Sequence, residues 1–232
     1  MKTARFPIAA ILPIVTLMTL GPLAAQEKPP LEKGTADKDA VGELPPLTSE
    51  TNRRAAAAFA RQDWKTAREL YEEVVRFAPD NALALTNLGT ACFQSGDHKA
   101  ARTHLEKAVE LQPRLTSAKV TLGITYFLLE DHYLAISTLS RAVHDAPTDA
   151  TAHNFLAVAL RHKGWIDGAE EELLEAIRLS PEYAEAHFNL ALVYLEREKP
   201  ALELARRHYY HALELGAAPD KVVEKQLKSV DM

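Results

Sequence analysis

The chain has 232 residues, of which 47% are hydrophobic, and its formal net charge is −5. This apolar content is typical of a packed globular protein and excludes a largely disordered chain. The excess of acidic residues argues against nucleic acid as the main partner, because phosphate binding requires clustered positive charge. A single cysteine excludes a disulfide framework and a cysteine-rich zinc site.

The first 25 residues predict a secretory signal peptide. Lys2 and Arg5 precede a short apolar run that ends before Gly21, and small residues lead up to Ala25. A basic start, a short apolar stretch and a small-residue junction form such a signal, so cleavage is expected after Ala25. An uncleaved N-terminal anchor is the alternative. No cysteine follows the junction, which argues against a lipid anchor, and the protein is predicted to be exported, either periplasmic or secreted.

Residues 26–47 predict a disordered linker. Paired prolines at 29–30 and 45–46 bracket a stretch that is rich in Glu, Lys, Asp and Gly. Such a segment buries too little apolar surface to offset the entropy lost on ordering. The segment is interpreted either as a tether or as a spacer without further role.

A period of 34 residues organises most of the remaining chain. Proline recurs at this interval at Pro79, Pro113, Pro147 and Pro181, and alanine at Ala67, Ala101, Ala135 and Ala169. One column is always small, at Ala55, Gly89, Gly123, Ala157 and Ala191, and another is bulky, at Tyr71, Leu105, Leu139 and Leu173. Apolar residues at helical spacing flank turn residues within each period, which predicts two helices and a turn. Small residues allow the two helices to approach closely, and such pairs must stack to bury their apolar faces.

On Leu88, Gly89, Ala101, Leu105, Ala108 and Pro113, the sequence resembles the tetratricopeptide repeat family. The resemblance implies an all-α fold, a right-handed α-solenoid of five 34-residue helix-turn-helix repeats at 48–81, 82–115, 116–149, 150–183 and 184–217. The last repeat keeps the pattern at Ala205 and Tyr209 only after a two-residue insertion. Residues 218–232 are predicted to form a C-terminal capping helix, with Val222, Val223, Leu227 and Val230 at helical spacing.

The sequence contains no catalytic constellation and no cofactor motif, so a non-enzymatic protein without cofactor is expected. Two pairs of histidines lie one period apart: His98 with His132, and His153 with His187. Their register with the repeat favours packing or surface roles. His208 and His211 lie three residues apart on a predicted helix, but two ligands without a third make a poor metal site. Cys92 lies in an apolar column and is predicted to be a buried, inert thiol.

The resemblance implies that the first helices line a concave groove, in which family members bind peptides or partner proteins. The residues predicted to contact a partner there are Phe59, Phe93, Phe127, Val120, Ile124, Val158, Arg161, Phe188 and Leu192. Contiguous apolar patches with aromatic anchors are typical of binding sites, and this groove favours a segment with hydrophobic side chains. The alternative is that these side chains pack between neighbouring repeats and never meet a ligand.

The combined prediction is a non-enzymatic scaffold or adaptor that binds a partner protein or peptide with apolar side chains, in the cell envelope. The clamp that some family members use for acidic chaperone tails is not expected, because Asn52 and Asn87 are present without an accompanying cation. Two alternatives stay open. One is a structural component that self-associates as a homo-oligomer, and the other is a metal-binding protein that uses its histidines.

Overall fold

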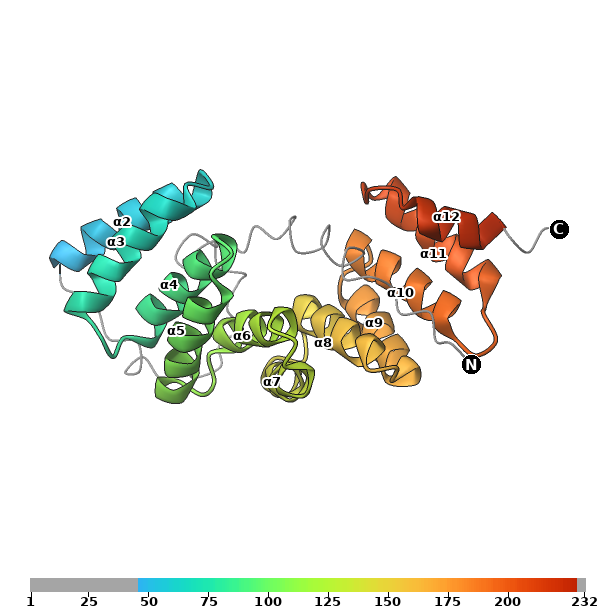
Figure 1. The fold of residues 1–232 in the computed structure, drawn as a ribbon, viewed down its shortest axis with the longest axis horizontal. Coiled ribbons are helices and arrows are strands. Elements are labelled where there is room, and N and C mark those ends of the chain that lie inside the picture. The colour runs from blue at the N-terminus through green and yellow to red at the C-terminus, as the bar shows by residue number, and fades with distance from the viewer. Residues whose placement is uncertain (1–45, 229–232) are drawn as a thin grey trace. The chain divides into compact units, whose positions relative to one another are not determined.

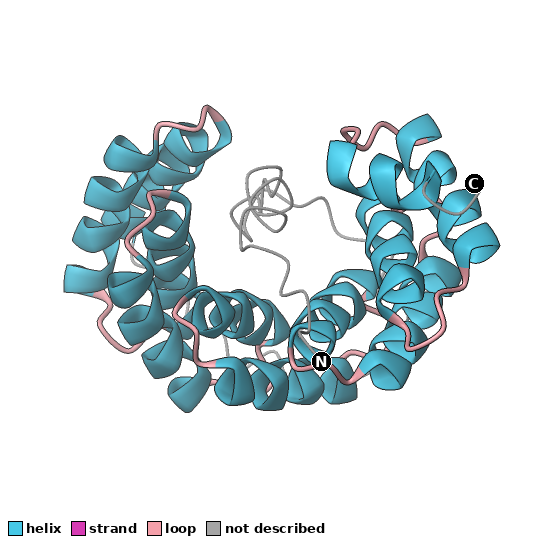
Figure 2. Cartoon of the chain, turned by 45° about the vertical axis from the view of Figure 1, so that its right-hand side comes forward, coloured by secondary structure: helices cyan, strands magenta, loops and turns pink. Residues whose placement is uncertain are grey.

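The computed structural model describes residues 46–228, and these residues form eleven helices and no strand (Figures 1 and 2). The all-α fold class is therefore confirmed. The predicted signal peptide at 1–25 and residues 26–45 of the predicted linker lie outside the described residues. The described helices divide into two compact units, residues 46–147 and residues 148–228.

The first unit contains three helical pairs. Their bounds are α2 Pro46–Ala60 with α3 Trp64–Phe77, α4 Ala82–Gln94 with α5 His98–Leu111, and α6 Thr116–Leu128 with α7 His132–Asp145. The two helices of each pair pack together, and successive pairs are joined by contacts of α3 with α4 and of α5 with α6. Helix α2 begins two residues before the predicted start of the array at 48. A proline at the first helical position is compatible with this start, because the N–H that it lacks would have no partner there.

The second unit contains two helical pairs and a terminal helix. Their bounds are α8 Ala150–His162 with α9 Ile166–Leu179, α10 Ala184–Glu196 with α11 Leu202–Glu214, and α12 Lys221–Lys228. Helix α12 packs on α11 through Val223 and Leu227, each 2% exposed, whereas Val222 is exposed. The Tyr209 hydroxyl accepts a hydrogen bond from the backbone N–H of Asp220 at 2.8 Å. The predicted capping helix is thus confirmed, and residues 229–232 lie outside the described residues.

Local sequence signals fix the helix ends. The side chains of Asp63, Asn81, Asp97 and Asp149 accept hydrogen bonds from backbone N–H groups in the first turns of α3, α4, α5 and α8. Such caps satisfy donors that have no partner within the helix. Each of the four prolines in register lies two residues beyond the end of α3, α5, α7 or α9, because proline cannot continue a helix.

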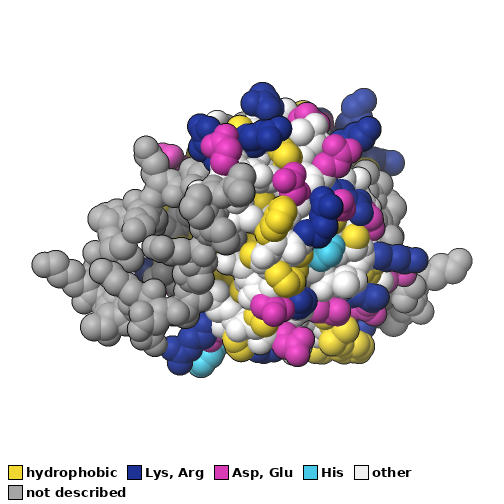
Figure 3. Space-filling model, turned by 90° about the vertical axis from the view of Figure 1, so that its left-hand side faces the viewer, with side chains coloured by type: hydrophobic (Ala, Val, Ile, Leu, Met, Phe, Trp, Pro, Cys, Tyr) yellow, Lys and Arg dark blue, Asp and Glu magenta, His cyan; other side chains and the backbone are white. Residues whose placement is uncertain are grey.

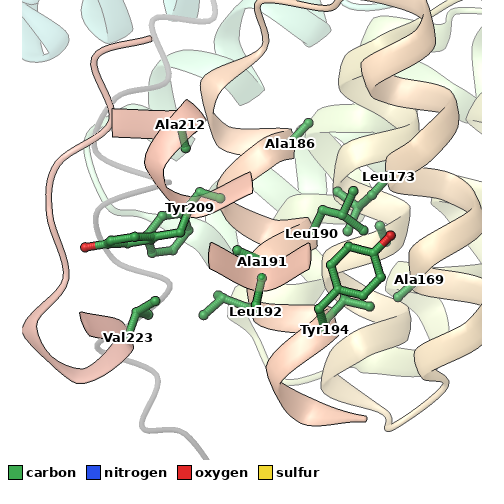
Figure 4. Close-up of a cluster of buried hydrophobic side chains, with 14 of the residues drawn as sticks. Ala169, Leu173, Ala186, Leu190, Ala191, Leu192, Tyr194, Tyr209, Ala212 and Val223 are labelled. Atoms are coloured by element: carbon green, nitrogen blue, oxygen red, sulfur yellow. The ribbon is translucent and has the colours of Figure 1, made fainter. Parts of the chain in front are cut away.

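The small and bulky columns form the contact between the two helices of a pair. A Cβ atom placed on Gly123 would lie 2.5 Å from Cγ of Leu139, and one on Gly89 would lie 2.6 Å from Cγ of Leu105. In the second unit, Leu173, Leu190 and Tyr209 are buried in one cluster that extends to α12 (Figure 4). The close approach predicted from the small column is therefore present.

The visible surface carries mixed charges. Lysine and arginine are interspersed with aspartate and glutamate on the face shown in Figure 3, and hydrophobic side chains lie among them. Within residues 46–228, no helix combines the length and the apolar character needed to cross a bilayer.

Candidate functional site

Each of the nine side chains predicted to contact a partner lies on the first helix of a pair. They are distributed over α2 (Phe59), α4 (Phe93), α6 (Val120, Ile124, Phe127), α8 (Val158, Arg161) and α10 (Phe188, Leu192). Their exposed fractions lie between 2% and 9%. The structure therefore differs from the expected exposed apolar patch, because these side chains are buried. Their contact with a partner stays a prediction.

The three phenylalanines of this set have a specific packing role. Each ring contacts the aromatic residue that begins the second helix of its pair: Phe59 meets Trp64 at 4.9 Å, Phe93 meets His98 at 5.5 Å, and Phe127 meets His132 at 5.3 Å between ring centroids. The two residues of each pair flank the same turn, so the chain reversal brings their rings together. In the sequence, the members of each column recur one period apart, but this spacing does not indicate that the two columns contact each other.

The first helices of the second unit carry a buried polar network. Nδ2 of Asn189 donates to Oδ1 of Asn154 at 2.9 Å, and Nδ2 of Asn154 donates to the Tyr183 hydroxyl at 3.3 Å. Nη1 of Arg161 donates to Oε1 of Glu196 at 2.6 Å. Burial raises the pKa of Glu196, while the Arg161 charge opposes that shift. Arg161 was predicted as a site residue, whereas Asn189 was missed.

Four buried polar atoms on first helices have no hydrogen-bond partner in the described structure. They are Oδ1 of Asn52, Oγ of Ser117, Nε of Arg161 and Oδ1 of Asn189. A buried polar atom without a partner costs free energy, and a bound ligand is one way to satisfy it. All four residues lie on α2, α6, α8 or α10, the helices that the resemblance assigns to the groove.

A third column places a polar residue near the start of three first helices, one period apart. Lys119, His153 and His187 are all buried, and each contacts a group from a second helix: Lys119 pairs with Asp145, His153 with Glu172, and His187 with His208. The His153 contact joins Nδ1 to Oε2 of Glu172 at 2.6 Å. The packing role predicted for the histidines agrees with these contacts. Cys92 is buried, and burial raises its pKa to about 11, so its thiol is inert at neutral pH.

The contact of His187 with His208 belongs to a cluster of three histidines in the second unit, which also includes His211. Nδ1 of His187 lies 2.9 Å from Nδ1 of His208, and the rings of His187 and His211 meet edge to face at 4.6 Å. The cluster lines a cleft of about 430 Å³, together with Ile177, Pro181 and Arg207. The sequence paired His208 with His211 but missed His187, because the two-residue insertion hides the register between α10 and α11.

The surroundings of His187 and His208 favour the neutral forms of these two rings. Burial, together with the neighbouring charges of His187, Arg207 and His211, lowers the pKa of His208 to about 4. Burial also lowers the pKa of His187. Among residues 46–228, no group of three or more His, Cys, Asp or Glu side chains is arranged to hold a metal ion.

Comparison with protein family models identifies the repeat in this chain. Two family models of the tetratricopeptide repeat match the chain, one over residues 47–114 and the other over residues 159–197. The matched segments include nearly all of α2, all of α3–α5 in the first unit, and all of α9 and α10 in the second. Both units contain tetratricopeptide repeats. A comparison with curated proteins finds no significant match.

Solved structures of other tetratricopeptide repeat proteins share this fold. MamA from Desulfovibrio magneticus RS-1 is 22% identical, with a TM-score of 0.65, over 75% of this chain and 97% of that one. A second MamA structure is 25% identical, with a TM-score of 0.61, over 69% and 93% of the two chains. YrrB, described as a TPR protein with an unusual peptide-binding site, is 22% identical, with a TM-score of 0.61, over 78% and 91%. At these identities, the likeness concerns the fold.

Proposed function

We propose that this tetratricopeptide repeat protein is a non-enzymatic scaffold that binds a partner protein or peptide along the first helices of its pairs. The observation that carries the proposal is the set of unpartnered polar atoms on Asn52, Ser117, Arg161 and Asn189. Amide, hydroxyl and guanidinium groups of this kind pair well with the N–H and C=O groups of an extended polypeptide. The peptide-binding site described for YrrB, which has the same fold, also supports this function.

Several of the apolar residues predicted to contact a partner lie on the same helices as these polar atoms. Ile124 and Phe127 follow Ser117 on α6, and Leu192 follows Asn189 on α10. A ligand with apolar side chains would place them against such residues while its backbone pairs with the polar atoms. Because all of them are buried, ligand entry requires the first-helix surface to open.

Photo-crosslinking in the native host tests the proposal. A photoreactive phenylalanine replaces Phe127 on α6, and the same residue replaces the exposed Tyr133 on α7 as a matched aromatic control. We expect an adduct with a partner from position 127 and none from position 133. We also expect Asn189→Leu to reduce this adduct, because it removes an unpartnered amide oxygen. Adducts from both positions, or adducts with the chain itself alone, would contradict the proposal, and the latter would indicate self-association.

Export is part of the same proposal and rests on the pattern of residues 1–25. We expect the mature protein to be recovered from the envelope or secreted fraction of the host with Gln26 as its first residue. N-terminal sequencing of the purified protein measures this directly. A chain that keeps Met1 in a membrane pellet would indicate an uncleaved anchor instead.

A further inference from the structure

The histidine pair in the cleft has a defined hydrogen-bond order. Nε2 of His187 lies 3.0 Å from the carbonyl oxygen of Pro181, which can only accept, so this nitrogen donates. In a neutral ring, Nδ1 of His187 is then the acceptor, and Nδ1 of His208 must donate to it. If the pair gains one proton, His187 donates through both nitrogens and Nδ1 of His208 becomes the acceptor, so the positive charge lies on a pair that contacts no carboxylate in the described structure. A carboxylate in the cleft would stabilise this charged form.

The preceding helical pair shows which group occupies the equivalent place. After the two-residue insertion, His208 on α11 corresponds to Glu172 on α9, as Tyr209 corresponds to Leu173. His153 contacts the carboxylate of Glu172, whereas His187 contacts a second histidine. The last pair thus retains the buried histidine but lacks the carboxylate that accompanies it.

The same comparison shows that the charge is reversed at five positions of the helix, whereas Asp167 corresponds to Glu203 and stays acidic. Four acidic positions of α9 become basic positions of α11: Glu170, Glu171, Glu172 and Glu175 are replaced by Arg206, Arg207, His208 and His211. One basic position, Arg178, becomes Glu214, which lies at the cleft and contacts Nδ1 of His211 at 3.2 Å. Apart from the three histidines, the ionisable side chains that line the cleft are Arg207, Glu214 and Tyr210. Helix α9 contributes the apolar side chain of Ile177.

We propose that the cleft between the C-terminal end of α9, the start of α10 and helix α11 binds a carboxylate of an acidic polypeptide segment, which contacts the His187–His208 pair as Glu172 contacts His153. Arg207 attracts the carboxylate, and Ile177 and Tyr210 contact the apolar part of the segment. Binding is coupled to proton uptake, because the bound carboxylate stabilises the protonated form of the histidine pair. The site shares no residue with the partner-binding set on the first helices, so the proposal goes beyond the scaffold function.

Calorimetric titration with two blocked peptides tests this site. The probes are acetyl-(Ala-Glu)3-amide and, as the uncharged control, acetyl-(Ala-Gln)3-amide, at pH 5.5 and pH 7.5 and at equal ionic strength. We expect only the glutamate peptide to bind, about tenfold more tightly at pH 5.5, because the bound carboxylate restores the usual pKa of a histidine. Succinate serves as a small carboxylic acid. Binding of succinate without binding of the peptide would overturn the assignment to a polypeptide segment.

Two variants separate this site from general charge effects. His208→Glu supplies the missing carboxylate from within, so it should keep the fold and reduce peptide affinity at pH 5.5 by at least tenfold. Arg207→Gln should also weaken binding, whereas Arg114→Gln removes an exposed charge in the other unit and should have no effect. Equal affinity of the native protein and His208→Glu, or binding of the glutamine peptide, would contradict the proposal. Crosslinking of a partner from position 127 should persist in His208→Glu. A negative result for the carboxylate site can therefore be distinguished from a negative result for the scaffold function.

Discussion

Gly123→Val is expected to lower the free energy of unfolding by about 3 kcal/mol, since overpacking costs about 1–3 kcal/mol or more and the glycine site has no spare volume. The first added carbon alone would lie 2.5 Å from Cγ and 2.9 Å from Cδ2 of Leu139. Alanine at the same position should cost about 1 kcal/mol, because the column already holds alanine at Ala157, beside Leu173, where the helices accommodate a methyl group. The difference between the two variants therefore comes from the two further methyl groups of valine and from its lower helix propensity.

Urea unfolding followed by helical circular dichroism measures this effect. The matched control is Gly168→Ala on α9, where the added carbon would meet only Cδ1 of Leu160, at 3.6 Å. This variant should gain about 0.5–1 kcal/mol, because alanine favours the helix over glycine. A valine at 123 that unfolds at the same urea concentration as the native protein would show that α6 and α7 do not touch there.

Acidification is expected to destabilise the second unit through His208. Its folded pKa of about 4 lies below the ordinary histidine value of 6.5, so the unfolded chain binds the extra proton first. Stability is therefore full above pH 6.5 and is lost as the pH falls from 6.5 towards 4. Each pKa unit corresponds to about 1.4 kcal/mol, and partial solvent screening of this half-buried ring reduces the loss between pH 7.5 and pH 5 to about 1–2 kcal/mol.

The comparison of native protein with His208→Gln isolates this contribution. Burial lowers the pKa of His98, His104 and His187 as well, so the native protein alone would report their sum. The variant should lose about 1–2 kcal/mol less than the native protein between the two pH values. Parallel pH profiles of the two proteins would show that His208 is not held neutral by its surroundings.

The spacing of residues along the chain determined the repeat architecture. Proline, small and bulky columns in register predict helical pairs, their ends and their close contact, because these features depend on local propensity and on a repeated short-range fit. The capping helix was predictable for the same reason, since Val223 and Leu227 follow helical spacing next to a surface that needs cover. The family resemblance likewise rests on residues that act within one repeat.

Only the tertiary structure shows which residues the side chains of these columns contact. Gln62 and Glu130 adopt positive φ angles of 60° and 65° at the turns where Gly96 and Gly164 do so, because the packed helices on either side fix the turn. The predicted partner-binding phenylalanines are buried against the next helix, a contact that depends on chain reversal rather than on periodicity. His187 meets His208 for a further reason. An insertion shifts the register by two residues, and only the packing of α10 on α11 shows which side chains then face each other.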